Sequence, residues 1–328
     1  MPTIPSRYIA RRAIYAAITF LVVLVLNFLL PRLLPGSPAD ILAAGSRLGA
    51  LKAAELTKEF GLGQPLSVQF VKYLQQLIQL PPNFGISYQY QQPVLTVVMR
   101  YLPWTIFLIG TATIITAVVG LFIGLLSAYR HGKRFDIGNL TVSMILWTVP
   151  YFWLALILLW IFGVDLHWLP FGSSVSFNAP NENFWQYAED VLSHSILPVA
   201  SIVIATYAQY MLIMRSTTLD VIREDFITVT RAKGLTTNRI IFRHVAKNAF
   251  LPMITMIALN LGYVVSGAIL VEIVFAYPGI GYTIYQAVIN HDYPLIQGAF
   301  FILAAAVISA NFIADVLLSV IDPRIRYR

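Results

Sequence analysis

Long runs of apolar residues alternate with polar segments along the whole chain. The six longest runs cover about residues 10–31, 102–129, 137–162, 195–215, 252–276 and 298–320. A helix needs about 20 mainly apolar residues to cross the hydrocarbon core of a bilayer, and each run meets that length. The pattern therefore predicts an all-α polytopic membrane protein with six transmembrane helices.

Three basic residues, Arg7, Arg11 and Arg12, lie before or at the start of the first run, as they would at the apolar core of a signal peptide. Its apolar stretch is longer than the usual core of a signal peptide, and no small-residue cleavage pattern follows it. We therefore expect a helix that is retained in the membrane.

Composition agrees with this class. Hydrophobic residues make up 58% of the 328 residues and charged residues 11%, against about 25% charged in soluble domains. Cysteine is absent, which excludes disulfides, thiolate metal sites and cysteine nucleophiles. Sorting of basic residues across the membrane accounts for the net charge of +7, so that charge gives no reason to expect nucleic acid as a partner.

The distribution of Lys and Arg predicts the orientation. If the N-terminus is cytoplasmic, the inner segments hold 16 of the 22 basic residues, seven of them from Arg215 to Lys247. The outer loops at about 163–194 and 277–297 hold none. Because basic residues favour the cytoplasmic side, both termini are expected there.

The spans divide the chain into three parts. Residues 1–31 form the cytoplasmic N-terminus and the first helix, and residues 32–100 form an external region. Residues 101–328 form a five-helix transmembrane core, which contains a large cytoplasmic loop at 216–250.

Two external segments are distinguished by their residues, one by apolar spacing and the other by aromatic content. Apolar spacing predicts helices at 51–60 and 66–80 in the first external region. The external loop 163–194 is rich in aromatic residues, which would either stack on sugars or form an interfacial belt. These residues are Trp168, Phe171, Phe177, Phe184, Trp185 and Tyr187.

The cytoplasmic loop combines charge with an ordered apolar pattern, which predicts a helix over Leu219–Lys233. The apolar stripe consists of Leu219, Ile222, Phe226 and Val229. Gly234 then ends the helix, and a second helix runs from about Thr237 towards Pro252. The pattern fits an amphipathic pair lying on the membrane surface as well as a helix that docks on a soluble partner.

Particular residues of this loop favour the docking interpretation. Arg231-Ala232-Lys233-Gly234-Leu235, Arg243-His244, Lys247-Asn248-Ala249 and Leu251-Pro252 resemble the EAA loop of ABC importer permeases of the dipeptide/oligopeptide family. Similar family marks are Leu33-Leu34-Pro35-Gly36-Ser37-Pro38-Ala39, Gly61-Leu62-Gly63-Gln64-Pro65-Leu66, Glu272 with Tyr277-Pro278-Gly279-Ile280-Gly281, and Asp322-Pro323-Arg324-Ile325-Arg326-Tyr327. Together these marks cover almost the full length of the chain.

The chain also departs from the family pattern. Thr228, Val229 and Thr230 differ from the alanine-rich form of the loop, and segment 80–90 differs from the family's shorter, glycine-rich version. The first difference bears on partner choice, and the second bears on the detail of the external region.

The resemblance implies a permease subunit that forms half of a translocation path in the plasma membrane of a prokaryote. It implies a second permease subunit, homologous to this chain and not identical, and an external substrate-binding protein. It also implies two ATPase subunits that carry ATP and Mg, so this chain itself would hold no cofactor and no metal. The residues that would couple to an ATPase are Glu224, Asp225, Phe226, Ala232, Lys233, Gly234 and Leu235.

The resemblance favours di- or oligopeptides as the substrate. Similar permeases carry oligosaccharides or nickel chelates, so these alternatives stay open.

The chain lacks the motifs that would let it drive transport or catalysis alone. No Gly-rich phosphate loop ends in Lys-Ser or Lys-Thr, because the single Gly-Lys pair, Gly132-Lys133, precedes Arg134. The five histidines have no metal-ligand spacing, and no Gly-x-Ser-x-Gly motif occurs. An intramembrane enzyme is therefore disfavoured. A secondary transporter would need carboxylate ion sites and inverted repeats, and no repeat is visible.

Two carboxylates lie within the apolar runs, where charge is costly and marks either a pathway or a structural pair. Glu272 precedes the break at Pro278-Gly279, where it would accept backbone N–H groups or act as a gate. Asp315 shares a helix face with Asn311, which predicts a structural partner on another helix.

Polar residues on three of the runs are candidates for lining the translocation path, although contacts between helices would explain them equally well. They are Ser143, Trp147, Tyr151, Thr206, Gln209, Tyr210, Asn260 and Tyr263. Gly120 and Gly124, four residues apart, predict close packing of the second run against another helix.

Overall fold

The computed structural model describes residues 6–33, 64–79, 81–178, 183–250, 253–254, 256–257 and 269–321, and most of these residues are helical. In chain order the helices are α1 (Ser6–Leu33), α4 (Leu66–Ile78), α5 (Val94–Tyr129), α6 (Arg134–Thr148), α7 (Tyr151–Leu158), the π-helix η1 (Leu159–Asp165), α8 (Phe184–Ile222), α9 (Asp225–Ala232), α10 (Thr237–Arg239), the π-helix η3 (Ile240–Val245), α11 (Ala246–Ala249), α13 (Ile269–Val274), α14 (Ile280–Ile289) and α15 (Tyr293–Ile321). Extended pairing within the described ranges is limited to one isolated bridge between Ile86 and Pro93.

Four helices are long and apolar enough to cross a membrane: Arg7–Leu29, Val94–Tyr129, Phe184–Ile222 and Tyr293–Val316. They coincide with four of the six predicted runs. Two of them, with 36 and 39 residues, extend well beyond the roughly 20 residues that a span requires.

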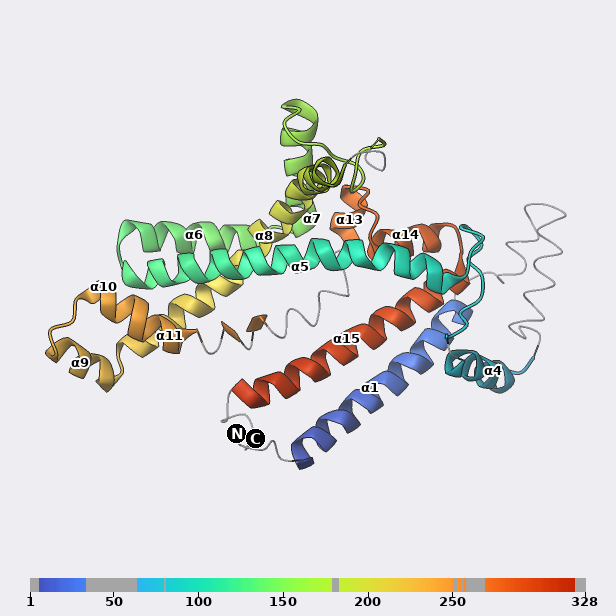
Figure 1. Ribbon diagram of the computed structural model, residues 1–328, viewed down its shortest axis with the longest axis horizontal. Helices are drawn as coiled ribbons and strands as arrows, with labels where there is room; N and C mark the ends of the chain where they lie inside the picture. Colours follow the sequence, from blue (N-terminus) through green and yellow to red (C-terminus); the bar gives the residue numbers. More distant parts are fainter. Residues whose placement is uncertain are drawn as a thin grey trace.

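The third run is bent. The sequence predicted one span over 137–162, and the structure has α6 followed by α7 and η1 at an angle of 99°. Val149 is extended (ψ 126°) and Pro150 follows it. Proline lacks an N–H and disfavours helical geometry in the residue before it, so α6 stops there. In Figure 1, α7 projects away from α5 and α6.

Part of the prediction falls on residues that the structure does not describe. The fifth run, 252–276, is described only at its two ends, and the later end is α13. The predicted helix 51–60 lies outside the described residues, whereas the predicted helix 66–80 is present as α4. The length and composition of the described helices therefore support four spans, or five if the bent pair counts as one.

The long helices form two groups (Figure 1). In the first, α5 and α8 run side by side in the same direction, and α6 packs on both of them. A Cβ at Gly120 would overlap the Cβ of Tyr210, and one at Gly124 would lie 2.6 Å from the carbonyl oxygen of Met211. The two glycines therefore permit the close packing that their spacing predicted.

In the second group α1 and α15 lie antiparallel, with α4 against one end of α1. Asn27 of α1 donates hydrogen bonds to the Tyr73 hydroxyl of α4 (3.2 Å) and to the Gln297 carbonyl of α15 (2.9 Å). One buried amide side chain thereby joins three helices.

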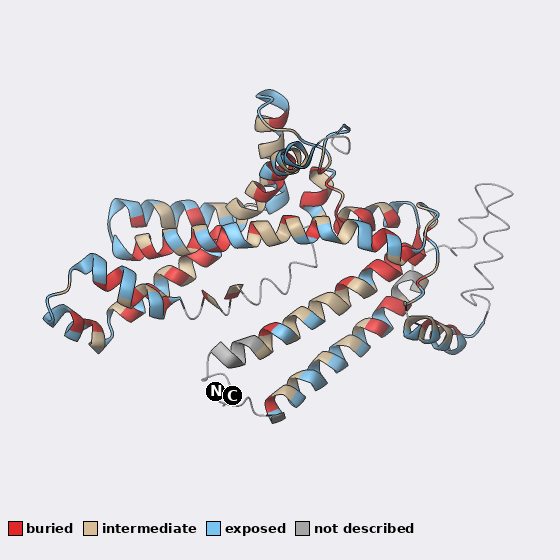
Figure 2. Ribbon diagram, in the orientation of Figure 1, coloured by how far each residue is buried: buried red, intermediate tan, exposed pale blue. Residues whose placement is uncertain are grey.

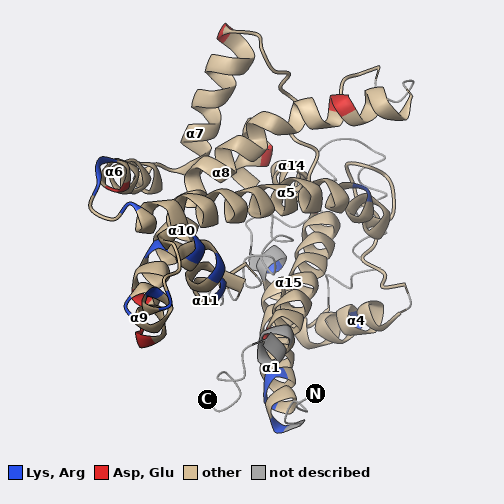
Figure 3. Ribbon diagram, turned by 60° about the vertical axis from the view of Figure 1, so that its left-hand side comes forward, with Lys and Arg blue, Asp and Glu red and all other residues tan. Residues whose placement is uncertain are grey.

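Large apolar side chains cover much of the outer surface of these helices (Figure 2). Leu21, Phe122 and Met144 are 61%, 62% and 61% exposed. Exposed apolar area of this extent requires lipid or another protein chain around it. Figure 3 shows that Lys and Arg gather at the start of α1, at the start of α6 and on α9–α11.

Candidate functional site

The charged loop begins where α8 ends, and it does not continue that helix. The predicted helix Leu219–Lys233 is in fact two helices, because α8 stops at Ile222 and α9 starts at Asp225. Glu224 is extended (ψ 146°) and takes the N-cap position of α9. The acidic pair Glu224 and Asp225 therefore lies at the N-terminus of α9, where its charge is favourable for the helix dipole.

The buried face of α9 also differs from the predicted stripe. Ile227 is only 1% exposed, whereas Val229 is 55% exposed. Phe226 is half-buried, and its carbonyl accepts a hydrogen bond from the Thr230 hydroxyl (2.7 Å). Because α9 starts anew after the turn, its buried positions are shifted from those that one continuous helix would have.

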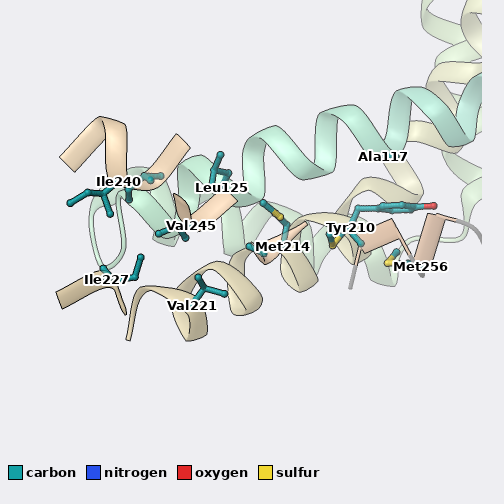
Figure 4. Packing of buried hydrophobic residues seen from close by; sticks show 12 residues of the cluster. Ala117, Leu125, Tyr210, Met214, Val221, Ile227, Ile240, Val245 and Met256 are labelled. Atoms are coloured by element: carbon teal, nitrogen blue, oxygen red, sulfur yellow. The ribbon is translucent and has the colours of Figure 1, made fainter. Parts of the chain in front are cut away.

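The buried face of α9 joins an apolar cluster that reaches into the membrane-length helices (Figure 4). We call it the α9 cluster. Its members include Leu125 of α5, Tyr210, Met214 and Val221 of α8, Ile227 of α9, and Ile240, Ile241 and Val245 of η3. The Tyr129 hydroxyl of α5 also donates to the Asn238 side-chain oxygen of α10 (2.9 Å). Since α9 contacts η3, and η3 contacts α8, a force applied to α9 would reach α8 through η3.

Gly234 ends the α9 segment as predicted. Its φ of +74° lies in the left-handed region, and a Cβ there would have no atom within 4 Å. Glycine is therefore favoured here by the backbone conformation and not by a lack of space. Its N–H bonds to the Arg231 carbonyl (2.9 Å), and Leu235 then packs against the α9 cluster.

The remaining coupling candidates lie on the outer surface of this segment. Glu224, Asp225, Ala232 and Lys233 are exposed. Together with exposed Val229 they present acidic, apolar and basic groups, as a docking surface for another protein would. Val229 belongs to the predicted apolar stripe, and the structure leaves it exposed.

Some candidates for the translocation path contact neighbouring helices. Ser143 of α6 is buried and donates to the Tyr207 hydroxyl of α8 (3.0 Å). The Thr206 hydroxyl lies 3.2 Å from that of Thr116 in α5, although Thr206 is otherwise exposed. Tyr210 is buried where α8 crosses Gly120.

The other path candidates are exposed or are not described. Gln209 is exposed on α8. Trp147 and Tyr151, on either side of the bend, are 56% and 39% exposed. Asn260 and Tyr263 lie outside the described residues.

Glu272 forms the centre of a second site at the opposite end of α5. It is fully buried, and its carboxylate accepts hydrogen bonds from the Thr105 hydroxyl (2.7 Å) and the Tyr282 N–H (2.9 Å). The Thr105 oxygen in turn accepts from the Ile280 N–H (2.8 Å). The carboxylate thus lies against the N-terminus of α14, where free N–H groups and the helix dipole favour an anion.

Pro278 and Gly279 form the turn that leads into α14. A Cβ at Gly279 would overlap the Glu272 carboxyl group, so only glycine leaves room for it. The structure therefore brings Glu272 to the backbone N–H groups beyond this turn, in the way the sequence suggested for a structural role.

Asp315 also has a partner on another helix. Its Oδ2 lies 3.1 Å from Nη1 of Arg12, which joins α15 to α1. Both side chains are partly exposed, at 24% and 33%. Across the described part of the chain, no group of three His, Cys, Asp or Glu residues is placed to hold a metal ion.

Comparison with known proteins gives matches along the full chain. Residues 120–327 match the family described as "Binding-protein-dependent transport system inner membrane component", and residues 6–109 match its N-terminal companion family. The di/tripeptide transport system permease protein DppB of Pseudomonas aeruginosa is 33% identical over 98% of this chain and 99% of its own. The oligopeptide transport system permease protein AppB of Bacillus subtilis is 33% identical, with 98% and 100% covered.

A third relative, the glutathione transport system permease protein GsiC of Salmonella paratyphi A, is 34% identical over 98% of this chain and 99% of its own. Among solved structures, a chain of the methionine ABC transporter MetNI in an inward-facing conformation matches 70% of this chain and 97% of its own. The TM-score is 0.55 at 14% sequence identity, so this likeness concerns the fold.

Proposed function

The chain belongs to the family of inner membrane components of binding-protein-dependent transport systems, and from this premise we propose how it works as the permease subunit of an ABC importer. Such subunits are transport components and not catalysts. We propose that this one forms half of a translocation path and that a second, homologous permease subunit forms the other half. The large exposed apolar surfaces of α5 and α6 support a partner chain within the membrane.

The observation that carries the proposal is the α9 segment. It exposes Glu224, Asp225, Val229 and Lys233, and its other face is anchored in the α9 cluster. We propose that α9 is the coupling helix and docks on one of two cytoplasmic ATPase subunits, which hold the ATP and Mg. Val229 would enter an apolar groove, and the acidic pair would meet basic groups.

Energy would then pass from the ATPases into the membrane through packing. Closure of the ATPase pair on ATP would displace α9. Because Ile227 and η3 belong to the same apolar cluster as Met214 and Val221 of α8 and Leu125 of α5, that displacement would tilt the two long helices. A second route would lead along the chain from Arg239 through Pro252 into the fifth span. Either route would switch the side to which the path is open.

The remaining proposals concern sidedness and cargo. We propose six spans in the plasma membrane of a prokaryote, with both termini and α9 in the cytoplasm, where the basic residues gather. The external region 32–100 and the loop 163–194 would receive a substrate-binding protein. The relatives are named for transport of di- and tripeptides, oligopeptides and glutathione, and we propose di- or oligopeptides as the cargo here.

Substitution of Gly234 tests the proposal. Gly234→Val forces a β-branched residue into a left-handed conformation, which costs a residue with a Cβ about 1–2 kcal/mol and a β-branched one more. Gly234→Asn is the matched control, because asparagine tolerates that conformation. Each variant is purified with its neighbouring subunits and assayed for ATPase co-purification and ATP-driven uptake of a labelled dipeptide.

We expect Gly234→Val to lose both co-purification and uptake, and Gly234→Asn to retain them. Normal ATP-driven uptake by Gly234→Val would refute the assignment of α9 as the coupling helix. Co-purification of an ATPase that is insensitive to every change in α9 would do the same.

A further inference from the structure

A buried ion pair joins the start of α6 to α8 close to α9. Asp136, in the first turn of α6, is 1% exposed, and Arg215 of α8 is 16% exposed. Arg215 contacts both carboxylate oxygens, with Nε 2.7 Å from Oδ1 and Nη2 2.8 Å from Oδ2. This two-point geometry fixes the direction as well as the distance of the contact.

The Asp136 carboxylate is held from α5 as well. The Ser127 hydroxyl of α5 donates to Oδ1 (2.9 Å), and the Gly132 N–H in the turn between α5 and α6 donates to Oδ2 (2.9 Å). His131 Nδ1 lies 3.3 Å from Oδ2 and 3.0 Å from Nη2 of Arg215. We call Ser127, Gly132, Asp136 and Arg215 the Asp136 clamp.

The position of the clamp connects it to the coupling segment. Arg215 follows Met214, and both precede Val221 on α8; Met214 and Val221 belong to the α9 cluster. The part of α8 that belongs to the α9 cluster is therefore the part that the clamp ties to α6. A second polar link, from Ser143 to Tyr207, holds α6 to α8 further along.

We propose that Asp136 and Arg215 are positioning residues for transport, which make α6 move with α8 when α9 is displaced. The proposal rests on the proposed function of α9 as the coupling helix. With the clamp intact, motion of α8 reaches the bend at Pro150 and so changes the direction of α7. Without it, α8 slides past the start of α6, and ATP hydrolysis continues with less transport.

The decisive readout is uptake per ATP hydrolysed, measured on the complete transporter in liposomes with an equal amount of complex for each variant. Asp136→Asn removes the charge and Arg215→Lys removes the two-point contact. We expect each to lower uptake per ATP by about fivefold or more, the lower end of typical coupling between distant sites. Because the two residues act as one unit, the double variant should be no worse than either single variant.

Asp292→Asn is the matched control. Asp292 is a buried carboxylate at the other end of the molecule, where it accepts a hydrogen bond from the Gln89 N–H (3.0 Å). We expect this variant to lower the amount of complex and to leave uptake per ATP unchanged. The same behaviour from Asp136→Asn and Arg215→Lys would show a role in folding alone and would overturn the proposal.

If the Asp136 and Arg215 variants fail to assemble, the proposal is tested by a distance measurement on a transporter whose clamp is unaltered. The chain has no cysteine, so spin labels at Thr141→Cys on α6 and Ser216→Cys on α8, both exposed, report only those positions. We expect their separation to stay constant when ATP is added to the working transporter. A changed separation would overturn the proposal, whereas failure of the unlabelled complex to bind any ATPase would instead refute the coupling role of α9.

Discussion

Replacing Thr105 with valine tests the account of the Glu272 site. The hydroxyl of Thr105 is fully buried and makes two contacts in opposite senses. It donates to the Glu272 carboxylate (2.7 Å) and accepts from the Ile280 N–H (2.8 Å). Valine has nearly the same shape, so the change removes both hydrogen bonds and leaves the packing in place.

The magnitude follows from those two bonds. Hydrogen bonds between membrane helices contribute about 0.6 kcal/mol on average and at most about 1.7 kcal/mol, so losing two costs about 1–3 kcal/mol. The upper half of that range applies here because one acceptor is a buried carboxylate. Thr283→Val is the matched control, since Thr283 is equally buried and its hydroxyl makes a single bond within its own turn, to the Gly279 carbonyl (2.8 Å).

The assay is the unfolding midpoint of the purified protein in detergent, for Thr105→Val, Thr283→Val, Glu272→Gln and the double variant of Thr105 and Glu272. We expect Thr105→Val to be clearly more destabilising than Thr283→Val, and its cost to shrink in the Glu272→Gln background by at least about 0.5 kcal/mol. Equal costs for the two threonines, or strictly additive effects with Glu272, would refute the reasoning.

Three further predictions concern helix packing and docking. Gly120→Leu places a side chain where Tyr210 lies, so α5 and α8 must separate. We expect the protein to lose about 1–3 kcal/mol of stability or more, measured as a lower melting temperature. An unchanged melting temperature would contradict the close packing of α5 and α8. Val229→Asp should abolish co-purification of the ATPase and leave the stability of the chain unchanged, because the Val229 side chain is exposed. Val229→Thr is the control. If the aspartate variant still binds the ATPase, Val229 is not part of the interface. Asn27→Leu should free α4 from α1 and α15, seen as faster hydrogen exchange over residues 66–78, and unchanged exchange there would show that other contacts hold α4.

Most of the helical framework could be predicted because its signals are local. Apolar runs, the turn at Gly234 and the spacing of Gly120 and Gly124 each depend on residues close together in the chain. Pro150 was a local signal for the bend between α6 and α7. The apolar run nevertheless predicted a single span there, because it is long enough to cross the membrane. The site was predicted less well, because burial on α9 depends on the direction in which α9 leaves α8.

The sequence by itself determined the class of protein, the existence of the charged segment after α8 and the positions of the long helices, since hydrophobic length and turn chemistry are properties of contiguous residues. Only the tertiary structure decided which polar groups meet. Arg215 and Asp136 are 79 residues apart, and Thr105 and Glu272 are 167 apart. The spacing of polar residues along single helices does not specify such contacts, because they depend on how the helices rotate and cross when their apolar faces pack.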